Sequence, residues 1–190
     1  MTIADSKFIR GKVPMTKEEV RAITLGKAAV SAGDIVWDVG AGTGSLTVEA
    51  ALLAPRGQVY AVEKSETALM VLKQNIKEFK VQNVEVVPGE APDALRQLPN
   101  PNIVFVGGSG GRLDKIIGVI AKKLEPKGRV VLNAITLNTV TTAIEKLKAS
   151  NFQVDITLAA ITKLEPLKDN FIYKAHNPVH IISAVKEEEN

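Results

Sequence analysis

The sequence predicts a three-layer α/β sandwich, with helices on both faces of a seven-stranded, mostly parallel sheet that contains one antiparallel strand. Short runs of β-branched and apolar residues, typical of strands buried on both faces, alternate along the chain with amphipathic helical segments. The last two strand-like runs are separated only by residues 163–178, too short for a helical crossover, so they should pair antiparallel. We expect one domain over residues 1–190, since this length suits a single core.

The first of these elements is a helix preceded by an arm. Residues 1–15 lack apolar periodicity, so we expect an arm that lies against the domain. Thr16 has the character of an N-cap, and Glu19 three positions later completes a capping box. This pattern predicts a helix that runs to about Ala32 and ends at Gly33.

The remaining elements follow from the same periodicities and turn residues. Strands are expected at residues 35–39, 58–63, 84–87, 102–106, 129–133, 152–162 and 179–185. Helices are expected at residues 45–53, 66–79, 93–98, 112–124 and 139–150. Residues 187–190 form a charged tail that we expect to be frayed.

The composition excludes several kinds of site. The chain has no cysteine, which removes disulfides, thiolate zinc sites and cysteine nucleophiles and fits a cytoplasmic protein. No residues have metal-ligand spacing, so no metal is expected, and no run of 18 apolar residues predicts a membrane span. Aromatic residues make up 4% of the chain, which argues against a nucleic-acid surface. The net charge of +3 suits an anionic partner.

A glycine-rich turn follows the first predicted strand. Gly40, Gly42 and Gly44 lead directly into a helix, an arrangement that brings backbone N–H groups and a positive helix end to a ligand. A dinucleotide fingerprint would need its third glycine at position 45, which is a serine. Glu63 ends the next strand, where a carboxylate can accept hydrogen bonds from ribose hydroxyls.

This combination resembles the nucleotide-binding half of the class I S-adenosylmethionine-dependent methyltransferases, which have a Rossmann-like fold; an NAD-binding domain is the alternative. The resemblance implies S-adenosylmethionine as cofactor, with Glu63 on the ribose and Glu90 and Ala91 near the adenine. For both glutamates the alternative is a solvated surface carboxylate. The expected cofactor-binding residues are Pro14, Met15, Thr16, Asp38, Gly40, Ala41, Gly42, Gly44, Glu63, Lys64, Glu90 and Ala91.

A second glycine-rich loop, Gly107–Gly111, follows the fourth predicted strand. Five small residues ahead of a helix that starts at Arg112 form a nest of amides that suits a carboxylate. A flexible turn beside a solvated basic helix is the alternative. The expected substrate-binding residues are Gly107, Gly108, Ser109, Gly110, Gly111, Arg112 and Asn133.

Two histidines are the remaining candidates for acid–base chemistry. His180 alternates with apolar neighbours, so we interpret it as structural. His176 lies in a loop from which it could reach the cleft, but a surface position is favoured over a catalytic one. The sequence assigns no catalytic acid or base.

With these residues located, the chain from about residue 8 to residue 186 resembles the decarboxylating precorrin methyltransferases of cobalamin biosynthesis. The segments that carry the resemblance are residues 11–20, 38–45, 106–111, 133–136 and 177–182. The glycine turn is common to the whole superfamily, whereas Pro14-Met-Thr16 and the double-glycine loop are more specific.

The resemblance implies methylation of carbon 15 of a cobalt-precorrin-6B-type tetrapyrrole, with loss of carbon dioxide from the ring C acetate. Pro14 to Thr16 would close over the cofactor, and the conjugated macrocycle would act as the electron sink, so that no strong base is needed. The resemblance also implies a homotetramer, a functional partnership with a separate carbon-5 methyltransferase, and neither a nucleic-acid nor a membrane partner.

Three alternatives stay open at this point. A tRNA adenine-N1 methyltransferase shares the run from Gly40 to Thr47, but such enzymes carry an acidic motif where Gly107–Gly111 stands. An NAD-dependent oxidoreductase is disfavoured by the glycine spacing. A catalytically silent S-adenosylmethionine-binding assembly subunit would keep the same cofactor residues.

Overall fold

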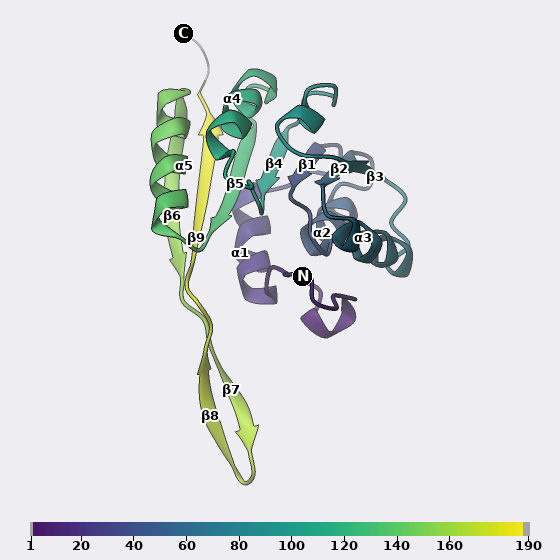
Figure 1. Ribbon diagram of the computed structural model, residues 1–190, viewed down its shortest axis with the longest axis vertical. Coiled ribbons are helices and arrows are strands. Elements are labelled where there is room, and N and C mark those ends of the chain that lie inside the picture. Colours follow the sequence, from purple (N-terminus) through teal and green to yellow (C-terminus); the bar gives the residue numbers. More distant parts are fainter. Residues whose placement is uncertain (1, 188–190) are drawn as a thin grey trace.

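The computed structural model describes residues 2–187, and a twisted seven-stranded sheet runs through its centre (Figure 1). The strand order is β3-β2-β1-β4-β5-β9-β6. All neighbours pair in parallel except β9, which is antiparallel to both β5 and β6, as predicted. The strands are β1 Ile35–Val39, β2 Gln58–Glu63, β3 Val84–Pro88, β4 Ile103–Val106, β5 Arg129–Ala134, β6 Phe152–Ala159 and β9 Val179–Lys186.

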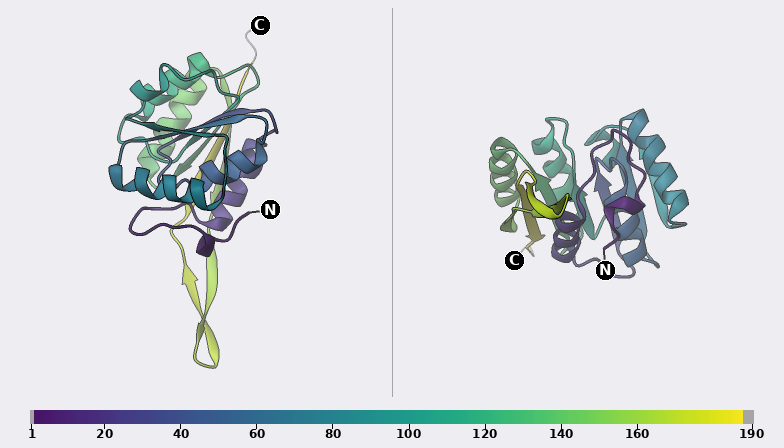
Figure 2. Two further views of the ribbon diagram at one scale, coloured as in Figure 1. Left: turned by 90° about the vertical axis from the view of Figure 1, so that its right-hand side faces the viewer. Right: turned by 90° about the horizontal axis from the view of Figure 1, so that it is seen from below.

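Helices cover both faces of this sheet, which confirms the predicted three layers (Figure 2). The helices are α1 Glu18–Ala28, α2 Ser45–Leu53, α3 Glu66–Glu78, α4 Leu113–Lys123 and α5 Leu137–Ala149, with short 3₁₀ turns η1 Asp5–Lys7 and η2 Asp93–Leu95. α1 and α2 pack on one face around Phe105 and Ile181, and α4 and α5 pack on the other around Trp37 and Ile182. Strand side chains alternate between these two cores.

The start and the end of α1 differ from the prediction. Thr16 is not the N-cap: Lys17 takes that position without a side-chain hydrogen bond. The capping box does not form because Glu19 pairs with Lys163 instead of reaching back along the helix. The helix ends at Ala28 rather than near Gly33, because Ala29 adopts the left-handed conformation at φ +48° and donates its N–H to the Leu25 carbonyl.

Three other elements have limits that differ from the predicted ones. The helix expected at residues 93–98 is only the 3₁₀ turn η2, and the sixth strand ends at Ala159 rather than at Thr162. α5 begins two residues earlier than expected, because the Thr136 hydroxyl caps it by accepting from the Thr139 N–H.

The largest departure from the sequence prediction is the segment between β6 and β9. Instead of a loop, residues Thr162–Leu167 (β7) and Asn170–Ala175 (β8) form a two-stranded antiparallel hairpin. The hairpin projects well beyond the sheet (Figure 1), and most of its side chains are exposed. The strand pattern is weak because no face of this hairpin is buried in the core, so no alternation of apolar and polar residues marks it.

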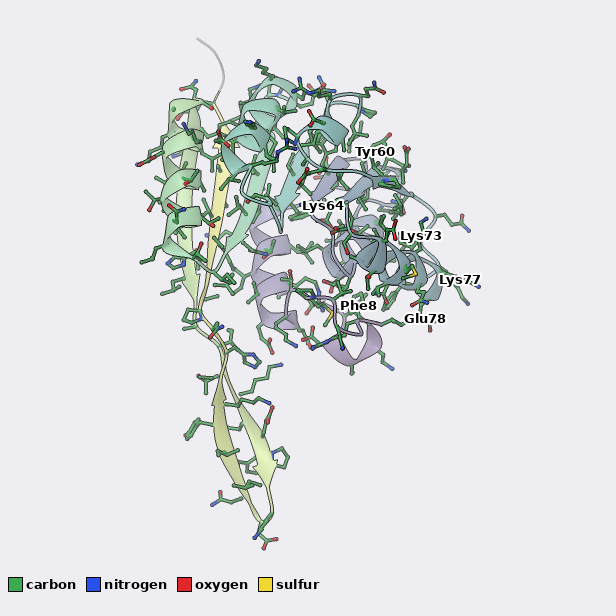
Figure 3. All side chains as sticks on the ribbon, viewed as in Figure 1. Phe8, Tyr60, Lys64, Lys73, Lys77 and Glu78 are labelled. Atoms are coloured by element: carbon green, nitrogen blue, oxygen red, sulfur yellow. The ribbon has the colours of Figure 1, made fainter. Side chains whose placement is uncertain are left out.

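The N-terminal arm lies against the domain, as expected. Phe8 is buried with its ring centroid 4.7 Å from that of Phe79, at the end of α3 (Figure 3). Asn75 of α3 bonds both backbone groups of Ile9, accepting from its N–H at 2.8 Å and donating to its carbonyl at 2.7 Å. At the other terminus only Glu187 of the expected tail is described, and its N–H donates to the Asn151 carbonyl; residues 188–190 lie outside the described residues.

Candidate functional site

A cavity of about 660 Å³ opens at the carboxyl ends of the parallel strands, where ligands bind in open α/β sheets. Its size is within the range of ligand pockets. The loops after β1, β2, β3 and β4 line one side, which we call the cofactor half. The arm closes over the cavity, and the other side, which we call the outer half, is lined by Lys17, Glu19, Val20, Asn133, Ile135, Ile161, His176, Asn177 and Val179.

The glycine turn of the cofactor half packs directly against the second glycine-rich loop. A Cβ atom on Gly40, whose φ is +73°, would lie 2.7 Å from the Gly108 nitrogen, so only glycine fits there. Glycine is required at position 44 for a different reason, because an added Cβ would lie 2.3 Å from the Leu72 side chain. Gly44 does not line the cavity. Gly40, Ala41 and Gly42 do line it.

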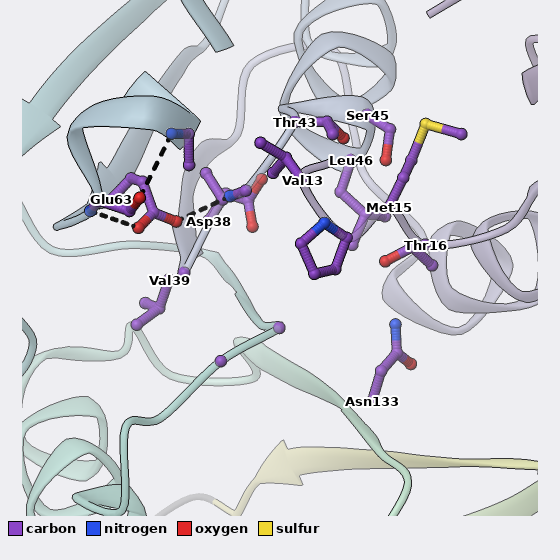
Figure 4. Close-up of a pocket in the computed structure, with 18 of the residues that line it drawn as sticks. Val13, Met15, Thr16, Asp38, Val39, Thr43, Ser45, Leu46, Glu63 and Asn133 are labelled. Carbon is purple, nitrogen blue, oxygen red and sulfur yellow. Dashed lines mark hydrogen bonds between the residues drawn. The ribbon is translucent and has the colours of Figure 1, made fainter. Parts of the chain in front are cut away.

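Glu63 is held in a fixed orientation at the floor of the cofactor half (Figure 4). Its Oε2 accepts from the Gly42 N–H at 2.9 Å, and its Oε1 accepts from the N–H groups of Lys64 and Ser65 at 2.8 Å each. A carboxylate has about four acceptor positions, so Oε2 can accept one further hydrogen bond. The side chain is therefore a preorganised acceptor and also a brace for the glycine turn.

Asp38 lies beneath the same turn and is buried, with 1% of its surface exposed. Its Oδ2 accepts from the Thr47 hydroxyl at 2.5 Å. Burial, together with the nearby Glu63 charge, raises the pKa of Asp38 to about 6, although the Thr47 bond opposes this. Asp38 lines the cavity.

Ion pairs join the loops at the rim of the cofactor half. Lys64 Nζ lies 2.8 Å from Glu90 Oε1, and Arg112 Nη1 lies 3.2 Å from Glu90 Oε2 and 3.6 Å from Asp93. The hydrogen bond from Lys64, with the charges of Lys64 and Arg112, lowers the pKa of Glu90. Glu90, Ala91 and Lys64 line the cavity, whereas Arg112 is directed to these carboxylates and does not line it.

The second glycine-rich loop offers fewer free amides than its sequence suggests. Residues 107–110 line the cavity, but Gly111 does not. The N–H groups of Gly107 and Gly108 donate to the Val39 carbonyl at 2.9 and 3.4 Å. These two amides fasten the loop to β1, so an anion would have to be met by Ser109 and Gly110.

The arm forms the roof of the cavity, and Arg21 holds it there. Pro14, Met15 and Thr16 line the cavity, and Figure 4 shows Thr16 beside Asn133. The Arg21 side chain has no exposed surface; its Nη1 donates to the Thr16 carbonyl at 2.6 Å and to Asp5 at 3.1 Å. Its Nε donates to Glu49 at 2.5 Å, and the guanidinium lies 4.9 Å from the Phe8 ring centroid.

Sequence reasoning missed Arg21, although a signal existed. Residues 21, 24, 25 and 28 lie on one face of α1, and the other three are the small or apolar Thr24, Leu25 and Ala28. An arginine on a buried helical stripe needs polar partners. Those partners come from the arm and from α2, distant in sequence.

In the outer half, Asn133 lines the cavity as predicted and is anchored from α1. The Thr24 hydroxyl lies 2.7 Å from the Val20 carbonyl and 3.1 Å from Asn133 Oδ1. This contact orients the amide at the end of β5. Asn133 therefore presents a fixed hydrogen-bonding group to a ligand in the outer half.

Both the helix α1 and the base of the hairpin also contribute to the outer half. Glu19 forms an ion pair with Lys163 of β7 and lines the cavity. Burial opposes ionisation of Glu19, but the Lys163 hydrogen bond and charge and the charge of His176 lower its pKa. His176 lines the cavity. The sequence had left open whether this loop residue would reach the cleft, and in the structure it does.

His180 is on the opposite face of β9, in line with Ile182 and Ala184 of the α4–α5 core. Its Nδ1 is buried, with no hydrogen-bond partner among residues 2–187.

Within the same described range, no group of three or more histidine, cysteine or acidic residues is arranged to hold a metal ion. None of the helices formed by these residues is long and apolar enough to cross a membrane.

Comparison with known proteins places this geometry in a family. Residues 8–186 match the model of the precorrin methyltransferase domain. A protein of Sulfurisphaera tokodaii, named probable cobalt-precorrin-6B C(15)-methyltransferase (decarboxylating), is 38% identical over 97% of each chain. The crystal structure of precorrin-6y C5,15-methyltransferase from Geobacter metallireducens superposes with a TM-score of 0.94 at 39% identity, covering 98% of both chains.

More distant structures share only the fold. The tRNA (m1A58) methyltransferase TrmI from Aquifex aeolicus superposes with a TM-score of 0.79 at 18% identity, over 96% of this chain and 73% of the other. Together the neighbours confirm the Rossmann-like α/β fold of class I methyltransferases.

Proposed function

The chain belongs to the precorrin methyltransferase family, and from this premise we propose that it methylates carbon 15 of a cobalt-precorrin-6B-type tetrapyrrole and removes a carboxylate as carbon dioxide. The observation that carries the proposal is the full-length match, at 36–40% identity, to relatives named as decarboxylating C(15)-methyltransferases. The family relationship disfavours the tRNA methyltransferase and NAD oxidoreductase alternatives.

We propose S-adenosylmethionine as the cofactor, bound in the cofactor half. It would supply an electrophilic methyl group on a sulfonium. The residues fit such a group: Oε2 of Glu63 can accept from a ribose hydroxyl, and the approach at Gly42 is close, since a Cβ there would lie 3.3 Å from the Pro14 carbonyl oxygen. Of the twelve predicted cofactor residues, all but Gly44 line the cavity.

The task of the chain would be to orient the two reactants and to exclude water. The arm, fastened by Arg21, covers the cofactor half, so Pro14 to Thr16 would shield the reacting groups from solvent. Asn133 and the amides of Ser109 and Gly110 are available to orient an anionic macrocycle. Arg112, Gly107, Gly108 and Gly111 would act indirectly, by holding the loop in shape.

We also propose that the protein is a homotetramer in the cytoplasm and that a separate protein methylates carbon 5. The hairpin supports self-association: Leu164, Leu167, Phe171, Ile172 and Tyr173 expose apolar surface on two short strands that the core does not cover. An isolated two-stranded hairpin is marginally stable in water, so a second copy of the chain is the partner that we expect.

The cofactor is tested by calorimetric titration with S-adenosylhomocysteine. Glu63→Gln should weaken binding by about 10- to 100-fold, because it replaces hydrogen bonds to a charged acceptor. Glu85→Gln, at an exposed position on β3, is the matched control and should bind like the unaltered protein. Preference for NADH, or equal affinity in both variants, would contradict the proposed site.

The reaction is tested with S-adenosylmethionine and cobalt-precorrin-6B, followed by mass spectrometry. One methyl group gained and one carbon dioxide lost would support the proposal. Tight binding of S-adenosylhomocysteine without formation of any product would instead indicate a catalytically silent assembly subunit. Methylation of a tRNA transcript would indicate the nucleic-acid alternative.

A further inference from the structure

His176 occupies the outer half of the cavity, across from the loops that would hold the cofactor. It lies between β8 and β9, and its N–H donates to the Ile161 carbonyl at 2.9 Å, which closes the base of the hairpin. The residue is half-buried and lines the cavity together with Asn133 and Asn177. Its backbone is therefore fixed while its side chain remains accessible to a ligand.

Glu19 is a carboxyl group in the same half of the cavity as His176. The ring is close enough to Glu19 for its positive charge to contribute to lowering the pKa of that carboxyl, after the larger effects of burial and of Lys163. Oε2 of Glu19 is buried and has no hydrogen-bond partner in the part of the chain that the structure describes. Lys163 occupies only the other oxygen, Oε1.

The proposed reaction needs a proton at a defined place. When the acetate loses carbon dioxide, its carbon–carbon bond breaks and the electron pair stays with the methylene carbon and the conjugated ring. That carbon must then take up one proton to become a methyl group. An acid positioned within the cavity would deliver this proton and be reprotonated by water.

Other cavity residues suit this step less well. Lys17 is engaged in an ion pair, with its Nζ 3.6 Å from Asp5 of the arm. Glu63 is occupied by three backbone N–H donors in the cofactor half of the cavity. Asp38 is bonded to Thr47 below the glycine turn, on the cofactor side of the cavity.

We propose that His176 is the catalytic acid that protonates the carbon from which carbon dioxide departs. The proposal rests on the proposed function. It assigns the two steps to opposite halves of one cavity: methyl transfer to the cofactor half, and proton delivery to the outer half.

The test compares His176→Asn with the unaltered protein, using S-adenosylmethionine and cobalt-precorrin-6B. We expect decarboxylated product to form about 100-fold more slowly, the usual contribution of a general acid. The affinity for S-adenosylhomocysteine should not change. Added imidazole should restore the rate of a His176→Ala variant.

The chain contains one other histidine, which provides a matched control. His180→Asn alters the same residue type on the same strand region but on the opposite face of β9, and it should not slow decarboxylation selectively.

Three results would overturn the proposal. The His176→Asn variant could decarboxylate as fast as the unaltered protein. This result would leave the proposed function intact but would show that His176 is not the catalytic acid. Equal losses in His176→Asn and His180→Asn, or weaker binding of S-adenosylhomocysteine in step with the lost rate, would indicate a structural role. An unaltered protein that binds the homocysteine compound but converts no precorrin would remove the proposed function and this inference with it.

Discussion

The N-terminal arm and the β7–β8 hairpin both extend from the central sheet, but they are held by different kinds of contact. Arg21, which has no exposed surface, binds Asp5 and Thr16 at the two ends of the arm and also pairs with Glu49 of α2. The hairpin has its own ladder and an exposed Lys174–Glu165 pair, and at its base the Lys163–Glu19 pair. Tyr173 is 79% exposed.

The position of the arm is therefore determined within one chain, whereas the hairpin is expected to need a second copy of the chain. Buried polar contacts in the arm are satisfied within the chain, so its roof over the cavity forms without other molecules. The hairpin leaves apolar side chains in water, a state that association with a second copy would relieve. The predictions below test this contrast, beginning with the largest effect.

Removing the Arg21 guanidinium should have the largest effect on stability. Arg21→Met leaves the buried Glu49 carboxylate without its cation, which should lower the free energy of unfolding by about 3–5 kcal/mol in urea titration. Arg56→Met, at an exposed position, should change it by less than about 0.5 kcal/mol. A loss below about 1 kcal/mol for Arg21→Met would mean that the arm does not depend on this residue.

Asp38 should make stability fall as pH rises through the acid range. Burial raises its pKa from an ordinary 3.8 to about 6, so between these values the folded chain keeps a proton that the unfolded chain has lost. Its contribution should therefore decrease by about 3 kcal/mol between pH 4 and pH 7.

The measurement is the difference in unfolding free energy between the unaltered protein and Asp38→Asn at several pH values. Asparagine does not titrate, so the difference isolates Asp38 from the other carboxylates. A difference that is flat across this range would show that Asp38 is ionised in the folded protein without penalty.

Substitutions in the hairpin should change assembly and leave the fold of the domain unchanged. Phe171→Ser with Tyr173→Ser removes two exposed aromatic side chains, so we expect a smaller particle in sedimentation experiments. Lys168→Ser at the hairpin turn is the control and should sediment like the unaltered protein. Unchanged sedimentation of the double variant would place the self-association surface elsewhere.

The smallest effect is expected at the ion pair between Lys27 of α1 and Asp155 of β6. Their side chains are 2.6 Å apart but are 36% and 64% exposed. Water screens such a pair, so Lys27→Met should leave the urea midpoint unchanged within error. A clear shift would show that charge pairing matters as much at the surface as it does around Arg21.

The sequence by itself determined the features that depend on local pattern. Apolar, β-branched runs predicted all seven strands of the sheet, and the glycines after β1 with Glu63 at the end of β2 pointed to the edge of the sheet where the cavity lies. These features are readable because strand periodicity and turn conformation depend on residues only a few positions apart.

Only the tertiary structure decided how distant residues share one cavity. It brought Glu19, Lys163 and His176 together, used Arg21 to fasten the arm, and directed Arg112 to Glu90 rather than to the cavity. It also showed a hairpin where the sequence predicted a loop. Such contacts join segments far apart in the chain, and a side chain's partner across that separation is set by the packing of the whole domain, which no local pattern records.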